Sequence, residues 1–350
     1  MRILVIALSG IGDALMFTPA LKLLRQNLPD SKIDTLVMFS GARDLYQRLP
    51  YVDNVLFHNF MNSSYVESLN YVLSLRNKYD ASINVYPSNR KEYNLINFLI
   101  GAKKRIGVRY LRNNFMNMGF LNNLVISEND DTHNVETNIH LAEFLTNKPS
   151  THLSAMEFPL CENDLNFAEL FMKEKTTDDQ LCIGFHPGCS VLKNHINRRW
   201  EPQKFAALAD KLVEKYNANI FIFGGPDEQN LKEEIVRFSV SDKVISVNTK
   251  NLGQTAALIK RMNVFVSNDS SLMHVASALG LKVVAIVGPT NTNYIKPWKT
   301  DYRIASLNLE CAPCFFYSPK PLTCTRADKK YKCIQDLEVD MVFKEVEKFL

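Results

Sequence analysis

Short apolar runs and helical patterns alternate along the whole chain, and this alternation is the feature that most constrains the fold. The first run, residues 2–8, is almost entirely apolar, which is typical of a strand buried on both faces of a parallel sheet. Apolar residues at helical spacing follow over residues 14–28 and stop at Pro29. Repeated strand–helix units predict an α/β protein in which helices cover both faces of parallel sheets.

The same patterns predict the remaining elements. Further strands are expected at residues 33–39, 55–58, 81–85, 181–186, 220–223, 264–267 and 283–287. Further helices are expected at residues 43–49, 65–78, 93–100, 140–145, 202–216, 227–238, 252–260, 271–278 and 339–349. The segment 148–158 is mostly polar or small, so we expect two doubly wound Rossmann-like domains, 1–150 and 151–350, that face a cleft.

Composition excludes several other classes of protein. Hydrophobic residues make up 46% of the 350 residues and charged residues 22%, which excludes disorder, collagen and coiled coil. The net charge of +4 is too weak to favour nucleic acid as a partner. No apolar run approaches the ~18 residues that a membrane span needs. We therefore expect a cytoplasmic protein, with association with the inner face of the membrane as an open option and its seven cysteines reduced.

Ligands of doubly wound sheets bind beyond the carboxyl ends of the strands, so the loops there are the informative ones. The first loop contains Gly10, Gly12 and Asp13. It lacks the third glycine of the dinucleotide fingerprint, because Leu15 stands at that position, and no P-loop motif occurs in the chain. Asp13 either caps the following helix or serves as a general base for an acceptor hydroxyl.

A second loop follows the predicted strand 181–186. Gly188 permits close backbone approach, and Ser190 offers a hydroxyl group. Arg198 and Arg199 offer forked donors for phosphate oxygens. The alternative is an ordinary solvated basic loop.

Two further loops carry small and polar residues. Gly225 lets a flat ring or a ribose approach the backbone, although Gly-Gly-Pro also forms an ordinary turn. Asp269 suits sugar hydroxyls, and Ser270 and Ser271 suit phosphate at a helix N-terminus, although such residues also cap helices. His274, taken alone, is more typical of a packed core histidine.

Four cysteines lie close together near the end of the sequence: Cys311, Cys314, Cys324 and Cys333. Four thiols within 23 residues suggest a tetrahedral structural zinc or iron site. The spacing after the opening Cys-x-x-Cys is not that of a standard zinc finger. Reduced thiols and disulfides therefore remain as alternatives.

Taken together, these motifs resemble glycosyltransferase family 9, the lipopolysaccharide heptosyltransferases. The resemblance rests on Gly10–Asp13 with Thr18-Pro19-Ala20-Leu21, His186-Pro187-Gly188 with Arg199-Trp200, Gly224-Gly225-Pro226, Asn268-Asp269-Ser270 through His274, and Gly288-Pro289-Thr290. It implies a GT-B fold in which the N-terminal domain holds the acceptor and the C-terminal domain holds a nucleotide-sugar donor. It also implies an inverting reaction whose chemistry needs no metal, with ADP-heptose as the default donor.

The resemblance assigns roles to individual residues. Asp13 matches the family's general base, and Arg198 stands near a position where the family commonly has a phosphate-binding lysine. Asp269, Ser270 and His274 match donor-site residues, whereas Ser271 replaces a usual glycine. The predicted donor-binding set is Gly188, Ser190, Arg198, Arg199, Gly225, Asp269, Ser270, Ser271 and His274. The predicted acceptor-binding set is Gly12, Arg90 and Arg109.

Seven basic residues in the first half are expected to form one basic surface for an anionic glycolipid or other glycan acceptor: Arg90, Lys91, Lys103, Lys104, Arg105, Arg109 and Arg112. An ordinary charged face is the alternative. Three other functions compete with lipopolysaccharide-core transfer: a nucleotide-sugar epimerase, a non-enzymatic sugar-nucleotide-binding subunit, and a transferase with a protein or metabolite acceptor. The sequence does not identify the sugar, the nucleotide base or the acceptor.

Overall fold

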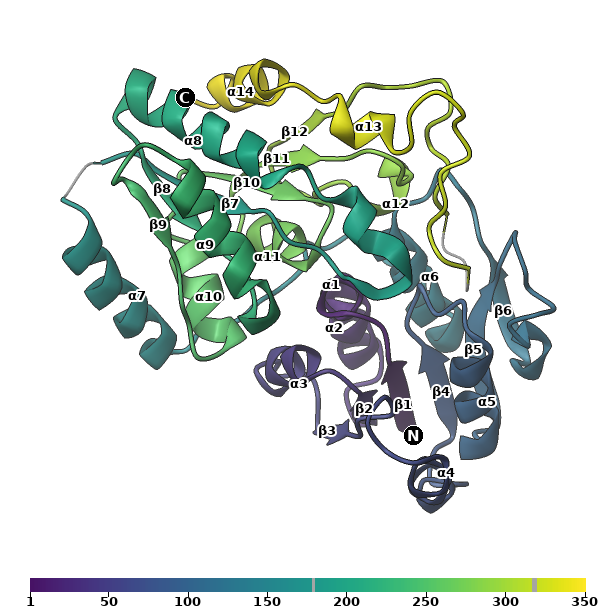
Figure 1. Ribbon diagram of the computed structural model, residues 1–350. Helices are drawn as coiled ribbons and strands as arrows, with labels where there is room; N and C mark the ends of the chain where they lie inside the picture. The colour runs from purple at the N-terminus through teal and green to yellow at the C-terminus, as the bar shows by residue number, and fades with distance from the viewer. Residues whose placement is uncertain (178–179, 317–319) are drawn as a thin grey trace. The chain divides into compact units, whose positions relative to one another are not determined.

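The structure is a computed structural model that describes residues 1–177, 180–316 and 320–350. These residues form two compact units, one of residues 1–159 and one of residues 160–316 and 320–350 (Figure 1). The predicted domain boundary, 150/151, lies in the polar segment shortly before Leu160. Each unit has its own parallel sheet with helices packed around it, which confirms the α/β, doubly wound fold class.

The described part of the first unit contains one six-stranded sheet, in the order β3-β2-β1-β4-β5-β6, and all of its strand pairs are parallel. The strands are β1 (Arg2–Ala7), β2 (Lys32–Val37), β3 (Asn54–Phe57), β4 (Ala81–Asn84), β5 (Lys104–Arg109) and β6 (Leu124–Ser127). Chain order reverses between β1 and β4, so the loops after these two strands meet at a topological switch point.

Helices of the first unit pack on this sheet. They are α1 (Ile11–Met16), α2 (Thr18–Asn27), α3 (Ser40–Gln47), α4 (Tyr65–Ser74), α5 (Lys91–Ile100) and α6 (Asn134–Thr146), with the 3₁₀ turn η1 (Gly119–Leu121). Leu4 and Ile6 of β1 belong to a buried cluster with Val72 of α4 and Ile100 of α5. Because side chains alternate along a strand, the intervening apolar residues of β1 face the opposite side.

The single helix predicted over residues 14–28 is wrong, because the structure has two helices there. Phe17 ends α1 and precedes α2, whose second residue is Pro19. Proline has no N–H to donate and restricts the residue before it, so it favours a helix start over a helix interior. Both segments keep apolar residues at helical spacing, which is why the periodicity alone does not reveal the break.

The described part of the second unit also contains one six-stranded parallel sheet, in the order β12-β11-β10-β7-β8-β9. The strands are β7 (Cys182–His186), β8 (Asn219–Ile222), β9 (Val244–Ser246), β10 (Val264–Asn268), β11 (Lys282–Ile286) and β12 (Tyr302–Ala305). The switch point of this sheet lies between β7 and β10. It therefore brings the loops after residues 186 and 268 together.

Helices of the second unit are α7 (Glu162–Lys175), α8 (Pro202–Tyr216), α9 (Gln229–Phe238), α10 (Leu252–Ile259), α11 (Ser271–Ala278), α12 (Thr292–Ile295), α13 (Lys332–Gln335) and α14 (Val339–Glu347), with 3₁₀ turns η2 (Leu192–Arg198) and η3 (Pro226–Glu228). Helix α8 begins with Pro202 and ends at Asn217 in the left-handed conformation (φ 53°), so both of its ends follow from local sequence. Helices α8 and α14 cover one face of the sheet, where Leu208, Leu212 and Val346 are fully buried.

Strands β5, β6, β9 and β12 and helices α7, α12 and α13 are absent from the sequence prediction. β5 reads Lys-Arg-Ile-Gly-Val-Arg, so charged residues at both ends hide its apolar centre. β9 has only three residues, and β12 has one fully buried side chain, Ala305. In the described part of the chain, every helix is too short or too polar to span a bilayer.

Candidate active site

Asp13 lies in the first turn of α1, at the carboxyl edge of the first sheet, and its side chain is half-buried. Its Oδ2 atom accepts the backbone N–H of Gly10 at 3.1 Å, so the residue closes the turn that leads from β1 into the helix. Gly12 is buried beside it in the same turn. A carboxylate accepts several hydrogen bonds at once, so this contact does not prevent Asp13 from serving as a base.

Buried tyrosines lie within electrostatic range of Asp13. Burial raises the pKa of Tyr46, Tyr93 and Tyr110, that of Tyr93 to about 12, and the Asp13 charge adds to the effect. The Tyr93 hydroxyl donates to the backbone carbonyl of Leu8 at 2.8 Å, in the loop that follows β1. The phenols are therefore neutral at physiological pH, and Asp13 contributes a negative charge to their surroundings.

Arg90 and Arg109 follow the two neighbouring strands of the first sheet. Arg90 precedes α5 in the loop after β4, and its guanidinium lies 5.9 Å from the ring centroid of Tyr93. Arg109 is the exposed last residue of β5. Both predicted acceptor residues thus stand at the carboxyl edge of the sheet that also holds Asp13.

The expectation of one continuous basic surface is wrong. Lys103 and Lys104 stand at the beginning of β5, whereas Arg109 stands at its end. A six-residue strand spans about 20 Å, so these side chains lie at opposite edges of the sheet. Arg105 is occupied internally, because its guanidinium donates to the carbonyl of Leu121 at 2.9 Å.

In the second unit, His186 at the end of β7 connects two of the predicted loops. Its Nδ1 atom lies 2.6 Å from Ser270 Oγ, and its Nε2 atom lies 3.1 Å from Glu228 Oε2. Ser270 is the N-cap residue of α11, but its side chain makes no capping hydrogen bond to the helix. The first-turn amides of α11 therefore receive no acceptor from their N-cap, and they are oriented to receive an anion.

Two glycines border the Glu228 carboxylate and have different surroundings. A Cβ atom on Gly188 would lie 1.8 Å from Glu228 Oε1. The group that lies close to the Gly188 backbone is therefore the Glu228 side chain. A Cβ atom on Gly225 would meet nothing within 4 Å, so the space above Gly225 is open. Burial acts to raise the pKa of Glu228, but the groups that donate to the carboxylate hold that pKa below its ordinary value.

Arg198 and Asp269 form a largely buried ion pair, with Nη1 and Oδ2 2.5 Å apart. Thr290 Oγ1 donates to the same carboxylate oxygen at 2.7 Å, and the second guanidinium nitrogen of Arg198 lies 3.2 Å from His195 Nδ1. The guanidinium also lies 5.6 Å from the ring centroid of Phe315. Four segments, those after β7, β10, β11 and β12, therefore meet around one guanidinium group.

Several buried polar atoms around this cluster have no hydrogen-bond partner among the described residues: Arg198 Nε, Arg199 Nε, His195 Nε2 and His274 Nδ1. Burial lowers the pKa of His195 and of His274 to about 4, so both rings are neutral at physiological pH. Buried polar atoms are rarely left unpaired unless a ligand or water completes them. We infer that this cluster is built to receive a polar ligand.

The remaining predicted donor residues lie around the same loops. Arg199 donates to the carbonyl of Cys189 at 2.7 Å and lies 3.6 Å from Glu228 Oε1. Ser190 is exposed, and its hydroxyl accepts the N–H of Leu192 at 3.2 Å. Ser271 is the first residue of α11 and is half-buried.

A comparison with protein families decides which family the chain belongs to. Residues 70–322, more than half of the chain, match glycosyltransferase family 9 (heptosyltransferase). The chain belongs to glycosyltransferase family 9. It is therefore an enzyme of the heptosyltransferase family, as the sequence motifs predict.

Relatives of this family 9 enzyme cover nearly its whole length. The lipooligosaccharide heptosyltransferase 2 of Haemophilus ducreyi is 30% identical over 315 residues, which are 85% of this chain and 86% of the relative. The solved ADP-heptose lps heptosyltransferase II of E. coli has 22% identity and a TM-score of 0.74, covering 100% and 98% of the two chains. The E. coli heptosyltransferase WaaC with ADP has 17% identity and a TM-score of 0.70, covering 100% of both. The structural likeness confirms the GT-B fold.

The described residues of the family 9 enzyme do not show the metal site predicted at the four cysteines. Cys311 and Cys314 are exposed, Cys324 is half-buried and Cys333 is buried. Within residues 1–177, 180–316 and 320–350, no group of three or more His, Cys, Asp or Glu side chains is arranged to hold a metal ion. Burial, with the charges of the other three thiols, raises the pKa of Cys333 to about 11, which favours the protonated thiol. The predicted zinc or iron site therefore stays a prediction.

Sequence reasoning did not assign site roles to His186, Glu228, His195 or Thr290. His186 ends the predicted strand 181–186 and Thr290 lies shortly after the predicted strand 283–287, so their place at the carboxyl edge was available as a signal. Glu228 and His195 carry no such signal, because their contacts depend on loops that come together only in the folded unit.

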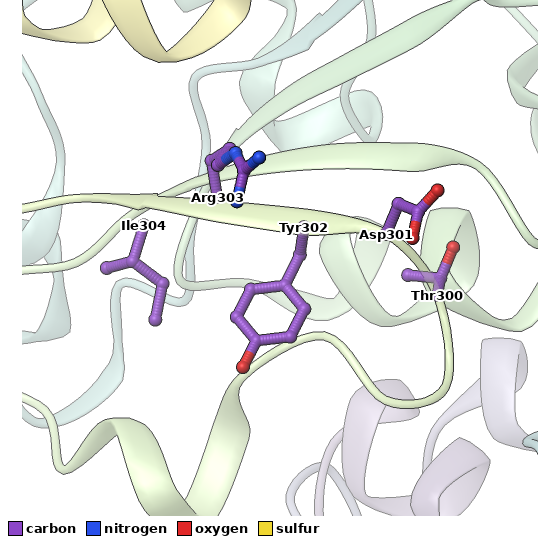
Figure 2. A pocket seen from close by; sticks show the side chains of 5 residues that line it. All are labelled: Thr300, Asp301, Tyr302, Arg303 and Ile304. Carbon is purple, nitrogen blue, oxygen red and sulfur yellow. The ribbon is translucent and has the colours of Figure 1, made fainter. Parts of the chain in front are cut away.

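The shallow pocket of about 530 Å³ beside β12 lies outside this cluster (Figure 2). It is lined by Thr300, Asp301, Tyr302, Arg303 and Ile304. Tyr302 and Ile304 point to one side of the strand and Arg303 to the other, as alternation along an edge strand requires (Figure 2). None of the predicted site residues lines it.

Proposed function

We propose that this family 9 enzyme transfers heptose from ADP-heptose to a hydroxyl group of a lipopolysaccharide-core-type acceptor, with Asp13 as the general base. The names of its relatives support the sugar and the acceptor, because they are lipooligosaccharide and lipopolysaccharide heptosyltransferases. One observation supports the donor part of this proposal: the Ser270 hydroxyl contacts His186 instead of capping α11. It leaves the first-turn amides of α11 open to an anion next to the Arg198–Asp269 pair.

The donor diphosphate has a physical reason to bind in the second unit. Amides at a helix N-terminus and a guanidinium group together supply the positive field that a diphosphate needs, without a metal ion. Arg198 has donor capacity beyond its contacts with Asp269, Thr290 and His195, because its buried Nε has no partner among the described residues. Asp269 accepts from Arg198 and Thr290 in this structure, and we assign it to the sugar hydroxyls of the donor.

The proposed reaction is a single displacement at the anomeric carbon. Asp13 takes the proton of the acceptor hydroxyl while that oxygen forms the new glycosidic bond. The bond from the anomeric carbon to the diphosphate oxygen breaks, and ADP leaves with the electron pair. Arg198 and the α11 amides meet the charge that develops on ADP, which is the kind of preorganised stabilisation that dominates many enzymatic barriers. Attack from the face opposite the leaving group inverts the anomeric configuration.

The other predicted residues have supporting roles in this proposal. The open space above Gly225 suits the ribose or the base. We assign Ser190, Ser271 and His274 to the border of the donor site. Arg199 positions the Glu228 carboxylate through their 3.6 Å contact. Gly12, Arg90 and Arg109 hold an anionic acceptor near Asp13 through backbone and guanidinium groups.

Replacing Asp13 by Asn separates binding from chemistry. We expect D13N to lower the transfer rate by about 10²- to 10⁴-fold, the usual contribution of a general base, while ADP affinity stays within twofold of wild type. Transfer is measured with ADP-heptose and a heptose-deficient core acceptor, and ADP affinity by calorimetry. D30N, at an exposed aspartate of the same unit, is the matched control and should retain wild-type turnover. Wild-type turnover of D13N would remove Asp13 as the base. Selective binding of UDP-sugars instead of ADP-heptose would overturn the proposed donor.

A further inference from the structure

The segment that connects β5 to β6 inverts the usual arrangement of polar and apolar side chains. Phe115, Met116 and Phe120 are exposed to 83%, 63% and 61%, and Leu111 and Met118 are exposed beside them. Asn117 and Asn122 of the same segment are buried instead. A loop in water ordinarily exposes its polar residues, so this segment presents an apolar surface that calls for a partner.

Hydrogen bonds hold the segment in this orientation. The buried Asn122 donates to the side chain of Asn94 on α5 at 2.8 Å, and Asn94 donates to the carbonyl of Asn117 at 2.7 Å. Asn117 accepts the N–H of Gly119 at 2.9 Å. The asparagines therefore anchor the loop to α5 and direct its large apolar side chains outward.

Helix α5, labelled beside β5 in Figure 1, packs against η1. Leu95 and Phe98 of α5 are exposed as well. The rings of Phe115 and Phe120 lie 5.8 Å apart, centroid to centroid. We call the set Leu95, Phe98, Leu111, Phe115, Met116, Met118 and Phe120 the apolar patch.

The charge of the surrounding chain is strongly positive. Residues 90–125 contain one acidic residue, Glu92, and seven basic ones: Arg90, Lys91, Lys103, Lys104, Arg105, Arg109 and Arg112. Arg112 is paired with Asp130, but Lys91, Lys103, Lys104 and Arg109 are exposed. Cations stand at both ends of β5, so the apolar patch has basic residues on either side along the strand direction.

We propose that the apolar patch docks this enzyme on an anionic lipid bilayer. Aromatic and methionine side chains enter the boundary between headgroups and acyl chains, and the lysines and arginines contact the anionic headgroups. Helix α4 also exposes apolar residues, among them Tyr65, Val66 and Leu69, but its one charged residue is Glu67. Charge complementarity therefore selects the apolar patch over α4. The inference extends the proposed function, since a glycolipid acceptor is held in a bilayer.

Vesicle co-sedimentation of the full chain tests the inference without any transfer reaction. One set of vesicles is phosphatidylcholine alone, and in the other set phosphatidylglycerol replaces roughly a third of it, to mimic an anionic leaflet. We expect wild type to bind the anionic vesicles preferentially and to dissociate at high salt. F115S/F120S should weaken partitioning at least about tenfold, because two exposed rings no longer enter the apolar boundary. K103Q/K104Q should weaken binding to anionic vesicles by about tenfold and reduce the preference for them.

L170S/V240S is the matched control, because it removes two apolar side chains of the second unit that are exposed to 69% and 93%. It should bind vesicles as wild type does, and all variants should keep wild-type ADP affinity. Absence of wild-type binding, equal binding to both vesicle types, or unchanged binding of F115S/F120S would each overturn the inference. Failure of the proposed transfer would appear instead in ADP-heptose binding and turnover, so the two failures are distinguishable.

Discussion

Gly188 and Glu228 share one space at the carboxyl edge of the second sheet, where a Cβ atom at position 188 would lie 1.8 Å from Glu228 Oε1. The carboxylate is held there by the N–H of Gly225 at 3.0 Å and by His186 Nε2 at 3.1 Å. His186 in turn holds Ser270 away from α11. The absence of a side chain at residue 188 thus contributes to leaving the N-terminus of α11 open.

Replacing Gly188 by Ala should displace the Glu228 carboxylate and break its contact with His186. We expect a loss of about 1–3 kcal/mol in the free energy of unfolding, the cost of breaking a hydrogen bond to a buried charged group. Weaker ADP binding should accompany it, because Ser270 loses its fixed partner. Urea denaturation and calorimetry measure the two effects.

The double variant G188A/E228A shows whether the clash is the cause. If it is, the double variant should be little less stable than E228A alone, because no carboxylate remains to be displaced. Simple addition of the two single effects would contradict the shared-space explanation.

Arg198→Ala should weaken ADP binding by roughly tenfold or more, because a charge-assisted hydrogen bond to phosphate contributes about 1.5–3 kcal/mol. Asp269→Asn should instead strengthen ADP binding, because Arg198 would no longer be paired with a carboxylate. The gain should be smaller for ADP-heptose, whose sugar is assigned to Asp269. Calorimetry with both ligands measures the ratio of affinities.

Arg237→Ala, at an exposed arginine of α9, is the control for the loss of one positive charge in the same unit. It should leave both affinities unchanged. Equal ADP affinity of R198A and wild type would exclude Arg198 from the phosphate site.

His274 should make the enzyme less stable as the pH falls. Burial lowers its pKa from 6.5 to about 4, although the nearby charge of Asp269 acts in the opposite direction. His274 therefore becomes protonated near pH 6.5 in the unfolded chain but only near pH 4 in the folded chain. Stability contributed by the neutral ring is present above pH 6.5 and is lost as the pH falls toward 4, by at most about 3 kcal/mol.

Urea denaturation between these pH values measures this slope. Carboxylates titrate in the same range, so the informative quantity is the difference between wild type and H274Q, which should have the shallower slope. H152Q replaces an exposed histidine and should keep the wild-type slope. Identical slopes for wild type and H274Q would show that His274 is not held neutral in the folded state.

Asn122→Leu should destabilise the first unit. Asn122 donates to Asn94 and accepts from Asn97, each at 2.8 Å, and all three side chains are buried. Leucine leaves the buried Nδ2 of Asn97 without its acceptor, at a cost of about 1–3 kcal/mol. Asn94 Oδ1 still accepts from Asn84 at 3.0 Å. N70A, at an exposed position of α4, should change the free energy of unfolding by less than about 0.5 kcal/mol. An unchanged urea midpoint for N122L would contradict the importance of this network.

Several strands of the second sheet can be predicted from residues 180–290 alone. β7, β8, β10 and β11 are runs of apolar residues buried on both faces, so their pattern survives without knowledge of their neighbours. β5 and β12 cannot be recognised in this way. Charged or half-exposed residues interrupt their apolar pattern, and pairing with the neighbouring strand is what makes them strands.

The sequence predicts which loops hold the site residues, but it does not predict which of these residues contact one another. Asp13, Arg198, Asp269 and Ser270 follow strands, and parallel strands deliver such residues to one edge of their sheet. The division of the basic residues between two edges of the first sheet could not be predicted in the same way, because it depends on recognising β5.

Local sequence by itself determined the order of strands and helices, the glycine and polar loops that follow the strands, and membership of a glycosyltransferase family. Tertiary structure alone decided that Arg198 pairs with Asp269, 71 residues away, and that Glu228 occupies the space above Gly188. The physical reason is the range of the forces that set each feature. Periodicity and turn chemistry act over a few residues, whereas ion pairs, hydrogen bonds and steric exclusion act between groups that only the folded sheets bring together.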